Sequence, residues 1–156
     1  MAILVTGGAG YIGSHTCVEL LNAGYDVVVA DNLYNSSKKA VDRVEQITGK
    51  KLKFYEVDLL DQPKVKEIFD KEEIEAVIHF AGLKAVGESV HKPLEYYNNN
   101  ITGTLILCDE MRKHGVKNIV FFQRYVVILK VLILSEYNLF NTIFCTINSC
   151  KQKSLP

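Results

Sequence analysis

Short apolar segments alternate along the chain with longer segments in which apolar residues recur at helical spacing. The short segments are rich in β-branched residues, and most of them end at a glycine or an aspartate, which is typical of strands. We expect five strands, at residues 3–5, 27–30, 52–57, 76–80 and 119–122. The segment 27–30 is apolar without interruption, as in a central parallel strand that is covered by helices on both faces.

The longer segments carry the start and stop signals of helices. We expect helices at residues 11–23, from Ser36 or Ser37 to 48, from Asp61 to about 73, and from Pro93 to 114. Gly24, Gly49 and Gly115 follow three of these segments, and glycine adopts the left-handed conformation that often ends a helix. The regular alternation of strand and helix predicts an α/β fold with a doubly wound parallel sheet.

Composition and charge limit the classes of function. A chain of 156 residues with 48% hydrophobic residues buries one good core, but a substrate-binding domain in addition would need more chain. The 18 basic and 18 acidic side chains give a formal net charge of zero, so no basic field attracts nucleic acid or an anionic membrane. We therefore expect no nucleic-acid or membrane partner, and a small anionic ligand would have to be held by local groups.

The cysteines and the amino terminus indicate the cellular setting. Cysteines at positions 17, 108, 145 and 150 show neither paired spacing nor a Cys/His cluster, so we expect no metal site and a reduced, cytoplasmic environment. The first residues lack the basic and apolar regions of a signal peptide.

The character of the sequence changes after Phe122. All ten glycines lie at or before Gly115, and residues 123–156 contain no Gly, Ala, Asp or His. Four basic residues and one acidic residue give this segment a charge of +3, which leaves −3 for residues 1–122. Its apolar run at 126–134 is far shorter than the roughly 20 residues that cross a bilayer, and resembles an aggregation-prone strand instead. We expect one doubly wound domain at 1–122 and an unrelated tail at 123–156.

A glycine-rich loop between the first expected strand and helix is the first candidate site. Its glycines, at positions 7, 8, 10 and 13, can be aligned as Gly-x-Gly-x-x-Gly or as Gly-x-x-Gly-x-x-Gly, and both patterns bring a backbone without side chains beside a pyrophosphate. The free N–H groups and the dipole at the start of the helix near Tyr11 favour phosphate charge. Asp31, about 20 positions on, can accept hydrogen bonds from both ribose hydroxyls and would repel a 2′-phosphate, so we expect NAD rather than NADP.

Two further polar residues at strand ends leave alternatives open. Asp58 follows the third expected strand at the same edge of the sheet, where both an adenine contact and a role as a turn or cap residue are consistent with the pattern. His79 lies inside an apolar strand, and we expect a hydrogen-bonded core histidine rather than a catalytic base.

Four segments together resemble the UDP-glucose 4-epimerase family of extended short-chain dehydrogenase/reductases. They are the glycine loop, Asp31–Ser36, His79–Val90 and Lys92–Tyr97, and the resemblance extends from Met1 to about Phe121. The related dTDP-glucose dehydratases share the glycine loop, but they have an Ala-Ala-x-Ser-His-Val type of segment where this chain has Ala81–Val86.

The resemblance implies a set of residues that bind NAD. The pyrophosphate would lie beside the glycine loop, the adenosine ribose beside residues 31–36 and the adenine beside Asp58. The nicotinamide half would lie over residues 80–84, with Lys84 donating hydrogen bonds, and Asn99 would hold the cofactor from the long helix. The implied cofactor-binding residues are Gly7, Gly10, Tyr11, Ile12, Gly13, Asp31, Asn32, Leu33, Tyr34, Asn35, Ser36, Asp58, Leu59, Phe80, Ala81, Gly82, Leu83, Lys84 and Asn99.

The resemblance also implies an activity, the interconversion of UDP-glucose and UDP-galactose through a 4-keto sugar, by enzymes that are often homodimers. The family's base is the tyrosine of a Tyr-x-x-x-Lys pair, whose phenol pKa of about 10 is lowered by the nearby ammonium. Neither Tyr125 nor Tyr137 has a lysine four positions later. We therefore expect no catalytic residue here and interpret the chain as a truncated, inactive member of the UDP-glucose 4-epimerase family. Residues 1–122 would be an incomplete Rossmann domain without a substrate domain, and the tail would be a frameshift or read-through product. The alternative is a non-catalytic NAD-binding remnant.

Overall fold

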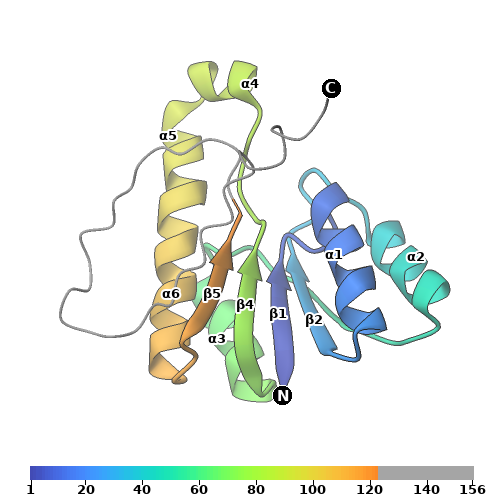
Figure 1. Ribbon diagram of the computed structural model, residues 1–156. Helices are drawn as coiled ribbons and strands as arrows, with labels where there is room; N and C mark the ends of the chain where they lie inside the picture. Colours follow the sequence, from blue (N-terminus) through green and yellow to red (C-terminus); the bar gives the residue numbers. More distant parts are fainter. Residues whose placement is uncertain (123–156) are drawn as a thin grey trace, which may run out of the picture.

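One parallel sheet organises residues 1–122, which are the residues that the computed structural model describes (Figure 1). Its strands are β1 (Ala2–Thr6), β2 (Asp26–Asp31), β3 (Lys53–Glu56), β4 (Ile74–His79) and β5 (Asn118–Phe121). They lie in the order β3-β2-β1-β4-β5, and all four neighbouring pairs are parallel. The doubly wound α/β fold is therefore confirmed. The expected tail at 123–156, with its apolar run, lies outside the described residues.

The helices follow the expected start and stop signals closely. They are α1 (Tyr11–Asn22), α2 (Lys38–Thr48), α3 (Gln62–Lys71), α4 (Val86–His91), α5 (Pro93–Tyr97), the π-helical turn η1 (Asn98–Thr102) and α6 (Gly103–Lys113). Ser37 caps α2 by accepting a hydrogen bond from the Lys39 amide, and Gly49 closes it with a φ of 66°. Asp61 caps α3 in the same way, through the Lys64 amide. None of the helices within residues 1–122 is long and apolar enough to cross a membrane.

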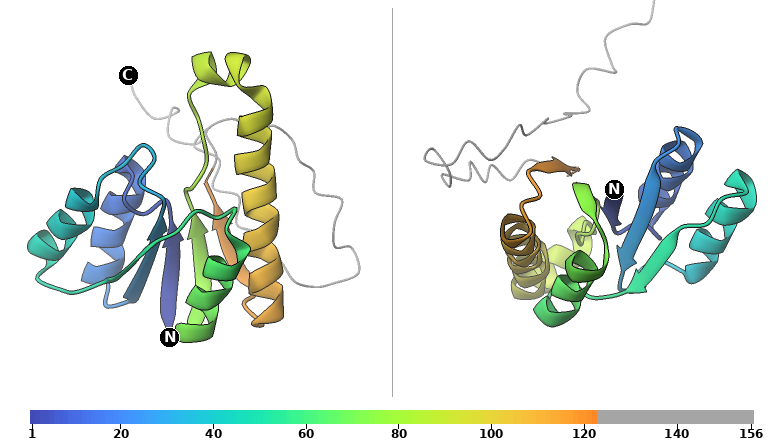
Figure 2. Two further views of the ribbon diagram at one scale, coloured as in Figure 1. Left: turned by 180° about the vertical axis from the view of Figure 1, so that it is seen from behind. Right: turned by 90° about the horizontal axis from the view of Figure 1, so that it is seen from below.

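Two apolar layers hold the helices against the sheet, because successive strand side chains point to opposite faces. Leu4, Val28 and Val77 pack with residues of α3 and α6 on one face. Val5 and Val29 pack with residues of α1 and α2 on the other face. Both views in Figure 2 show the two helix layers with the sheet between them.

The structure corrects the expected helices at three places, and β4 begins at Ile74, two residues before the expected strand. α3 ends at Lys71 rather than about residue 73, because Glu72 is extended and its carboxylate accepts hydrogen bonds from Lys53 and Tyr55. The helix expected from Pro93 to 114 contains the π-helical turn η1 and ends at Lys113. α4 was not expected, and its N-cap, Ala85, makes no side-chain hydrogen bond that could have marked it.

Candidate functional site

The loops that follow β1, β2, β3 and β4 meet at one edge of the sheet, at the upper side of Figure 1. β1 lies between β2 and β4, so the chain turns to opposite sides of the sheet after β1 and after β4. A crevice at such a reversal of strand order is where ligands bind in open α/β sheets. The expected site residues lie in these loops, in the first turn of α1, at the end of β2, or in the helical segment that begins at Pro93.

The glycine loop needs its glycines because backbone segments approach one another closely. A Cβ atom at Gly13 would lie 2.3 Å from the Gly7 carbonyl oxygen, and one at Gly7 would lie 2.6 Å from the Ala81 amide nitrogen. Gly7 also has a φ of 72°, which L-residues other than glycine rarely adopt. The loop therefore packs tightly against the start of α1 and against the segment after β4.

The amino terminus of α1 is open toward an anion. Its N-cap, Gly10, has no side chain to bind the first-turn N–H groups, and the first turn contains no acidic residue. Tyr11 is 83% exposed and Ile12 46% exposed, so solvent reaches this end of the helix. Because unpaired N–H groups and the helix dipole favour negative charge, the loop fits a phosphate group.

The Asp31 carboxylate joins the glycine loop to the loop after β2. Its Oδ2 accepts a hydrogen bond from the Ala9 amide (3.0 Å), and its Oδ1 accepts bonds from the Leu33 amide (2.9 Å) and the Ser36 hydroxyl (2.7 Å). Leu33 has a φ of 57°, the left-handed conformation, and its bond to Asp31 helps to hold it there. Asp31 is thus a structural anchor at the place where a ribose-binding carboxylate is expected.

Asp58 extends this polar edge to the loop after β3. Its Oδ1 accepts a hydrogen bond from the Leu60 amide, and its Oδ2 accepts one from the Asn32 side chain at 3.0 Å. The turn role, one of the two alternatives left open for Asp58, is therefore observed, and the adenine contact stays a prediction. Tyr34 and Asn35 lie in the same region and are exposed.

Asn100 holds the loop that follows β4. Its Oδ1 accepts a hydrogen bond from the Leu83 amide (2.8 Å), and its Nδ2 donates one to the Leu83 carbonyl (3.0 Å). Asn99, the residue selected from the sequence, donates to the Asn100 side chain instead. Sequence reasoning missed Asn100, although the run Asn98-Asn99-Asn100 was the available signal.

His79 links β1, β4 and α6 as a neutral side chain. Thr104 donates its hydroxyl hydrogen to the Asn100 carbonyl, so His79 Nε2 must donate to Thr104, while Nδ1 accepts from the Thr6 hydroxyl at 2.6 Å. Burial, together with the nearby charge of Lys84, lowers the pKa of His79 to about 3. The expectation of a hydrogen-bonded core histidine is confirmed.

Lys84 lies over the carboxyl ends of β4 and β5. Its ammonium donates hydrogen bonds to the carbonyls of Phe80 (3.2 Å) and Phe122 (3.4 Å) and lies 5.7 Å from the centre of the Phe122 ring. Partial burial of the amine lowers its pKa.

A Tyr-x-x-x-Lys spacing does occur once in the sequence, at Tyr34 and Lys38, and sequence reasoning missed it. Lys38 begins α2, and its amine lies 5.9 Å from the centre of the Phe54 ring. Tyr34 lies in the loop after β2 and Lys38 at the start of α2, on the side of the site where the adenosine is expected. The position of this pair does not correspond to a catalytic pair after the fifth strand. Tyr125 and Tyr137 lie outside the described residues.

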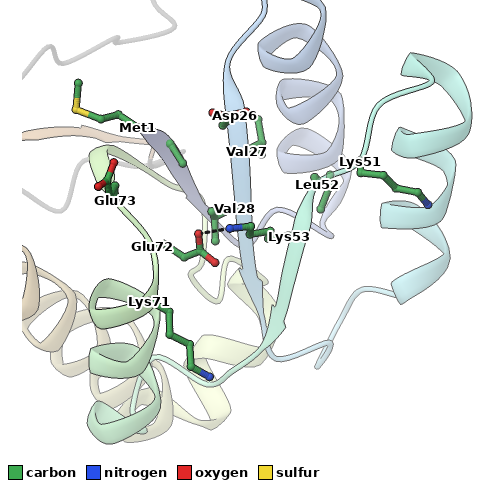
Figure 3. A pocket seen from close by; sticks show the side chains of 11 residues that line it. Met1, Asp26, Val27, Val28, Lys51, Leu52, Lys53, Lys71, Glu72 and Glu73 are labelled. Atoms are coloured by element: carbon green, nitrogen blue, oxygen red, sulfur yellow. Dashed lines mark hydrogen bonds and ion pairs between the residues drawn. The ribbon is translucent and has the colours of Figure 1, made fainter.

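A hollow of about 370 Å³ lies at the opposite, amino-terminal edge of the sheet (Figure 3). Charged side chains line much of it, but Lys53 is paired with Glu72, Lys71 with Glu67 and Lys51 with Glu45. The glycine loop and the carboxylates described above are at the other edge, so this hollow does not contribute to the candidate site.

A doubly wound sheet with a glycine loop, an open helix terminus and a carboxylate after the second strand defines a dinucleotide-binding domain. The model of the NAD dependent epimerase/dehydratase family matches residues 3–123, and the chain belongs to this family.

Within this family, the chain is similar to UDP-glucose 4-epimerases. The chain is 72% identical over 121 residues to that of Bacillus subtilis, covering 78% of this chain and 36% of the relative. It is 58% identical over 121 residues to one from Klebsiella pneumoniae, of which it covers 87%. The crystal structure of the Bifidobacterium longum enzyme in complex with NAD⁺ and UDP matches 78% of this chain and 36% of its own, with 57% identity and a TM-score of 0.76. The chain therefore spans about a third of the length of most curated relatives that it matches.

Proposed function

We propose that residues 1–122 bind NAD at the carboxyl edge of the sheet, as the cofactor-binding part of a UDP-glucose 4-epimerase. The observation that carries this proposal is the Asp31 carboxylate, which is bonded to the glycine loop next to the open terminus of α1. When bound, NAD would supply reversible hydride transfer with the sugar of such an epimerase. The match to NAD dependent epimerases supports the choice of cofactor.

Each group of the site contacts a different part of the dinucleotide in this proposal. The N–H groups of Tyr11 and Ile12 face the pyrophosphate, and the loop Asp31–Ser36 receives the adenosine ribose. The Asp58–Leu59 segment contacts the adenine. On the far side, the loop 80–84, held by Asn100, supports the nicotinamide half, and Lys84 and Asn99 donate hydrogen bonds to it.

We infer further that the chain of 156 residues binds the cofactor without converting UDP-sugars. No tyrosine after Phe122 is followed by a lysine at the fourth position, and the one pair with that spacing, at Tyr34 and Lys38, lies on the adenosine side. Residues 1–122 then act as a cofactor-binding domain, and the sequence of residues 123–156 contains no Tyr-x-x-x-Lys pair.

Calorimetry with NAD and NADP on the chain of 156 residues tests the proposed cofactor. We expect NAD to bind more tightly than NADP, because the Asp31 carboxylate repels a 2′-phosphate. The control is Gly10→Val, which adds a side chain to the glycine loop beside the proposed place of the pyrophosphate. A Cβ atom at Gly10 meets only the Gly7 carbonyl oxygen within 4 Å, at 3.2 Å. Equal heats for wild type and Gly10→Val, or tighter binding of NADP, would contradict the proposal.

A further inference from the structure

Glu110 of α6 is a buried carboxylate outside the site described above. The residue is 0% exposed, and its Oε1 accepts hydrogen bonds from the Gln62 side chain (2.9 Å) and from the Lys113 ammonium (2.8 Å). Its Oε2 is buried and has no hydrogen-bond partner among the described residues. A buried carboxylate with an unpaired oxygen is unfavourable, so an apolar side chain would serve stability better at this position. Unlike an apolar side chain, Glu110 accepts a hydrogen bond from Gln62.

Gln62 is the first residue of α3 and directly follows the turn Asp58–Asp61. Inside this turn the Asp61 amide donates to the Asp58 carbonyl (3.0 Å), and the Leu60 amide donates to the Asp58 carboxylate (2.9 Å). These two hydrogen bonds hold the turn together. A hydrogen bond that fixes the position of Gln62 therefore also fixes the carboxyl-terminal end of the turn.

A second contact joins the same turn to α6. A Cβ atom at Gly103 would lie 3.3 Å from the Leu59 Cβ, so the glycine allows Leu59 to approach the helix closely. Gly103 and Glu110 are seven residues apart, about two helical turns, and so lie on one face of α6. The turn is thus held at Leu59 by packing and at Gln62 by a hydrogen bond.

We propose that Glu110 is a positioning residue for the adenine end of the bound dinucleotide, acting through Gln62 on the turn Asp58–Asp61. This inference rests on the proposed binding of NAD. The turn presents Asp58, whose Oδ2 accepts a hydrogen bond from Asn32 in the loop expected beside the ribose. α6 therefore sets the place of the adenine-side turn relative to the ribose-side loop, while Asn100, in the adjoining π-helical turn, holds the nicotinamide-side loop.

The test compares the affinities of two dinucleotides that differ only in the base. Calorimetry on the chain of 156 residues measures the dissociation constants of NAD and of nicotinamide hypoxanthine dinucleotide, in wild type, Gln62→Leu, Glu110→Leu and the double variant. We expect wild type to prefer NAD and each single variant to reduce this preference at least about threefold, the order of one lost hydrogen bond. The double variant should reduce it no further, because the two side chains act through one contact.

Lys113→Met is the matched control, because it removes the other partner of Glu110 Oε1 without touching the turn. Its preference for NAD should equal that of wild type.

A lowered melting temperature with unchanged preference in Gln62→Leu and Glu110→Leu would show a purely structural role and overturn the inference. Equal affinities of the wild type for the two dinucleotides would also overturn the inference. If wild type binds neither, the proposed function fails and this inference with it. If Glu110→Leu does not fold, the half-buried Gln62→Leu decides alone.

Discussion

At the scale of single residues, Asp31 serves the fold as well as the proposed cofactor. Asp31→Ala leaves three donors, the amides of Ala9 and Leu33 and the Ser36 hydroxyl, without their acceptor. We expect this variant to lower the free energy of unfolding by about 1–3 kcal/mol, the cost of unsatisfied buried groups. It should also lose its preference for NAD over NADP, because the charge that repels a 2′-phosphate is gone.

Urea denaturation and calorimetry measure these two effects separately. Asp42→Ala, which removes an exposed aspartate of α2, is the control for the loss of a carboxylate and should leave both quantities near their wild-type values. An Asp31→Ala variant as stable as wild type would mean that the hydrogen bonds of this carboxylate do not hold the two loops together.

His79 makes stability depend on pH. Its pKa in the folded chain, about 3, lies below the ordinary value of 6.5, so the folded state favours the neutral ring. The stability that it contributes is complete above about pH 6.5 and is lost as the pH falls toward 3, with a slope of at most about 1.4 kcal/mol per pH unit. In His79→Gln we expect a flatter decline of unfolding free energy between pH 6.5 and 4 than in wild type.

Urea denaturation over this pH range checks the difference in slope, since carboxylates contribute to the acid decline in both proteins. His15→Gln is the matched control because His15 is exposed, and it should follow the wild-type curve. Parallel curves for wild type and His79→Gln would show that the ring becomes protonated in the folded state near its usual pKa.

At the scale of elements, the π-helical turn η1 places Asn100 against the loop 80–84. In Asn100→Ala the amide and carbonyl of Leu83 lose both side-chain partners. We predict faster hydrogen exchange at the Leu83 amide and weaker NAD binding, since the loop no longer has a fixed position. Asn98→Ala, an exposed substitution in the same turn, should leave exchange at Leu83 unchanged. Protection at Leu83 in Asn100→Ala would show that other contacts order the loop.

The elements that sequence could predict are those whose signals are local. Ser37, Asp61 and Gly49 end or begin helices through their own side chains or their own backbone freedom, and the structure has them at those positions. The contact beside η1 is of a different kind, because the Thr104 hydroxyl donates to the Asn100 carbonyl and accepts from His79 of β4 at once. Such a contact needs β4 and the helix to be already packed, so no local pattern indicates it.

At the scale of the whole molecule, the expected site residues do converge on one edge of the sheet, because parallel strands end there together. Sequence patterns place a residue at a strand end, but they do not show which side chains satisfy one another across the fold. The hydrogen bonds that Asn100 accepts from Leu83 and that Glu110 accepts from Gln62 join residues 17 and 48 positions apart. Sequence patterns could not predict these contacts because the bonded residues are far apart in the chain, whereas Asp31 could be found from its spacing to the glycines.

We predict that the purified chain of 156 residues, made in a host without an epimerase, does not interconvert UDP-galactose and UDP-glucose even with excess NAD. A positioned acid or base contributes about 10²–10⁴-fold to a rate, and orientation of the reacting groups contributes about 7–11 kcal/mol more. A coupled assay for UDP-glucose should give the same rate as Gly10→Val. Turnover clearly above that control would place a working base among residues 123–156 or in the described site.

The central position of β1 bears on how the chain folds as it is synthesised. β1 is made first, yet one of its two neighbours is β4, and the Thr6–His79 bond that joins them spans 73 residues. Until β4 has left the ribosome, one edge of an apolar strand has no native partner, a state that favours association between nascent chains. Pairing at such long separation also slows folding. While a ribosome pauses before residue 79, the nascent chain therefore has its central strand, β1, without the partner β4 at one edge.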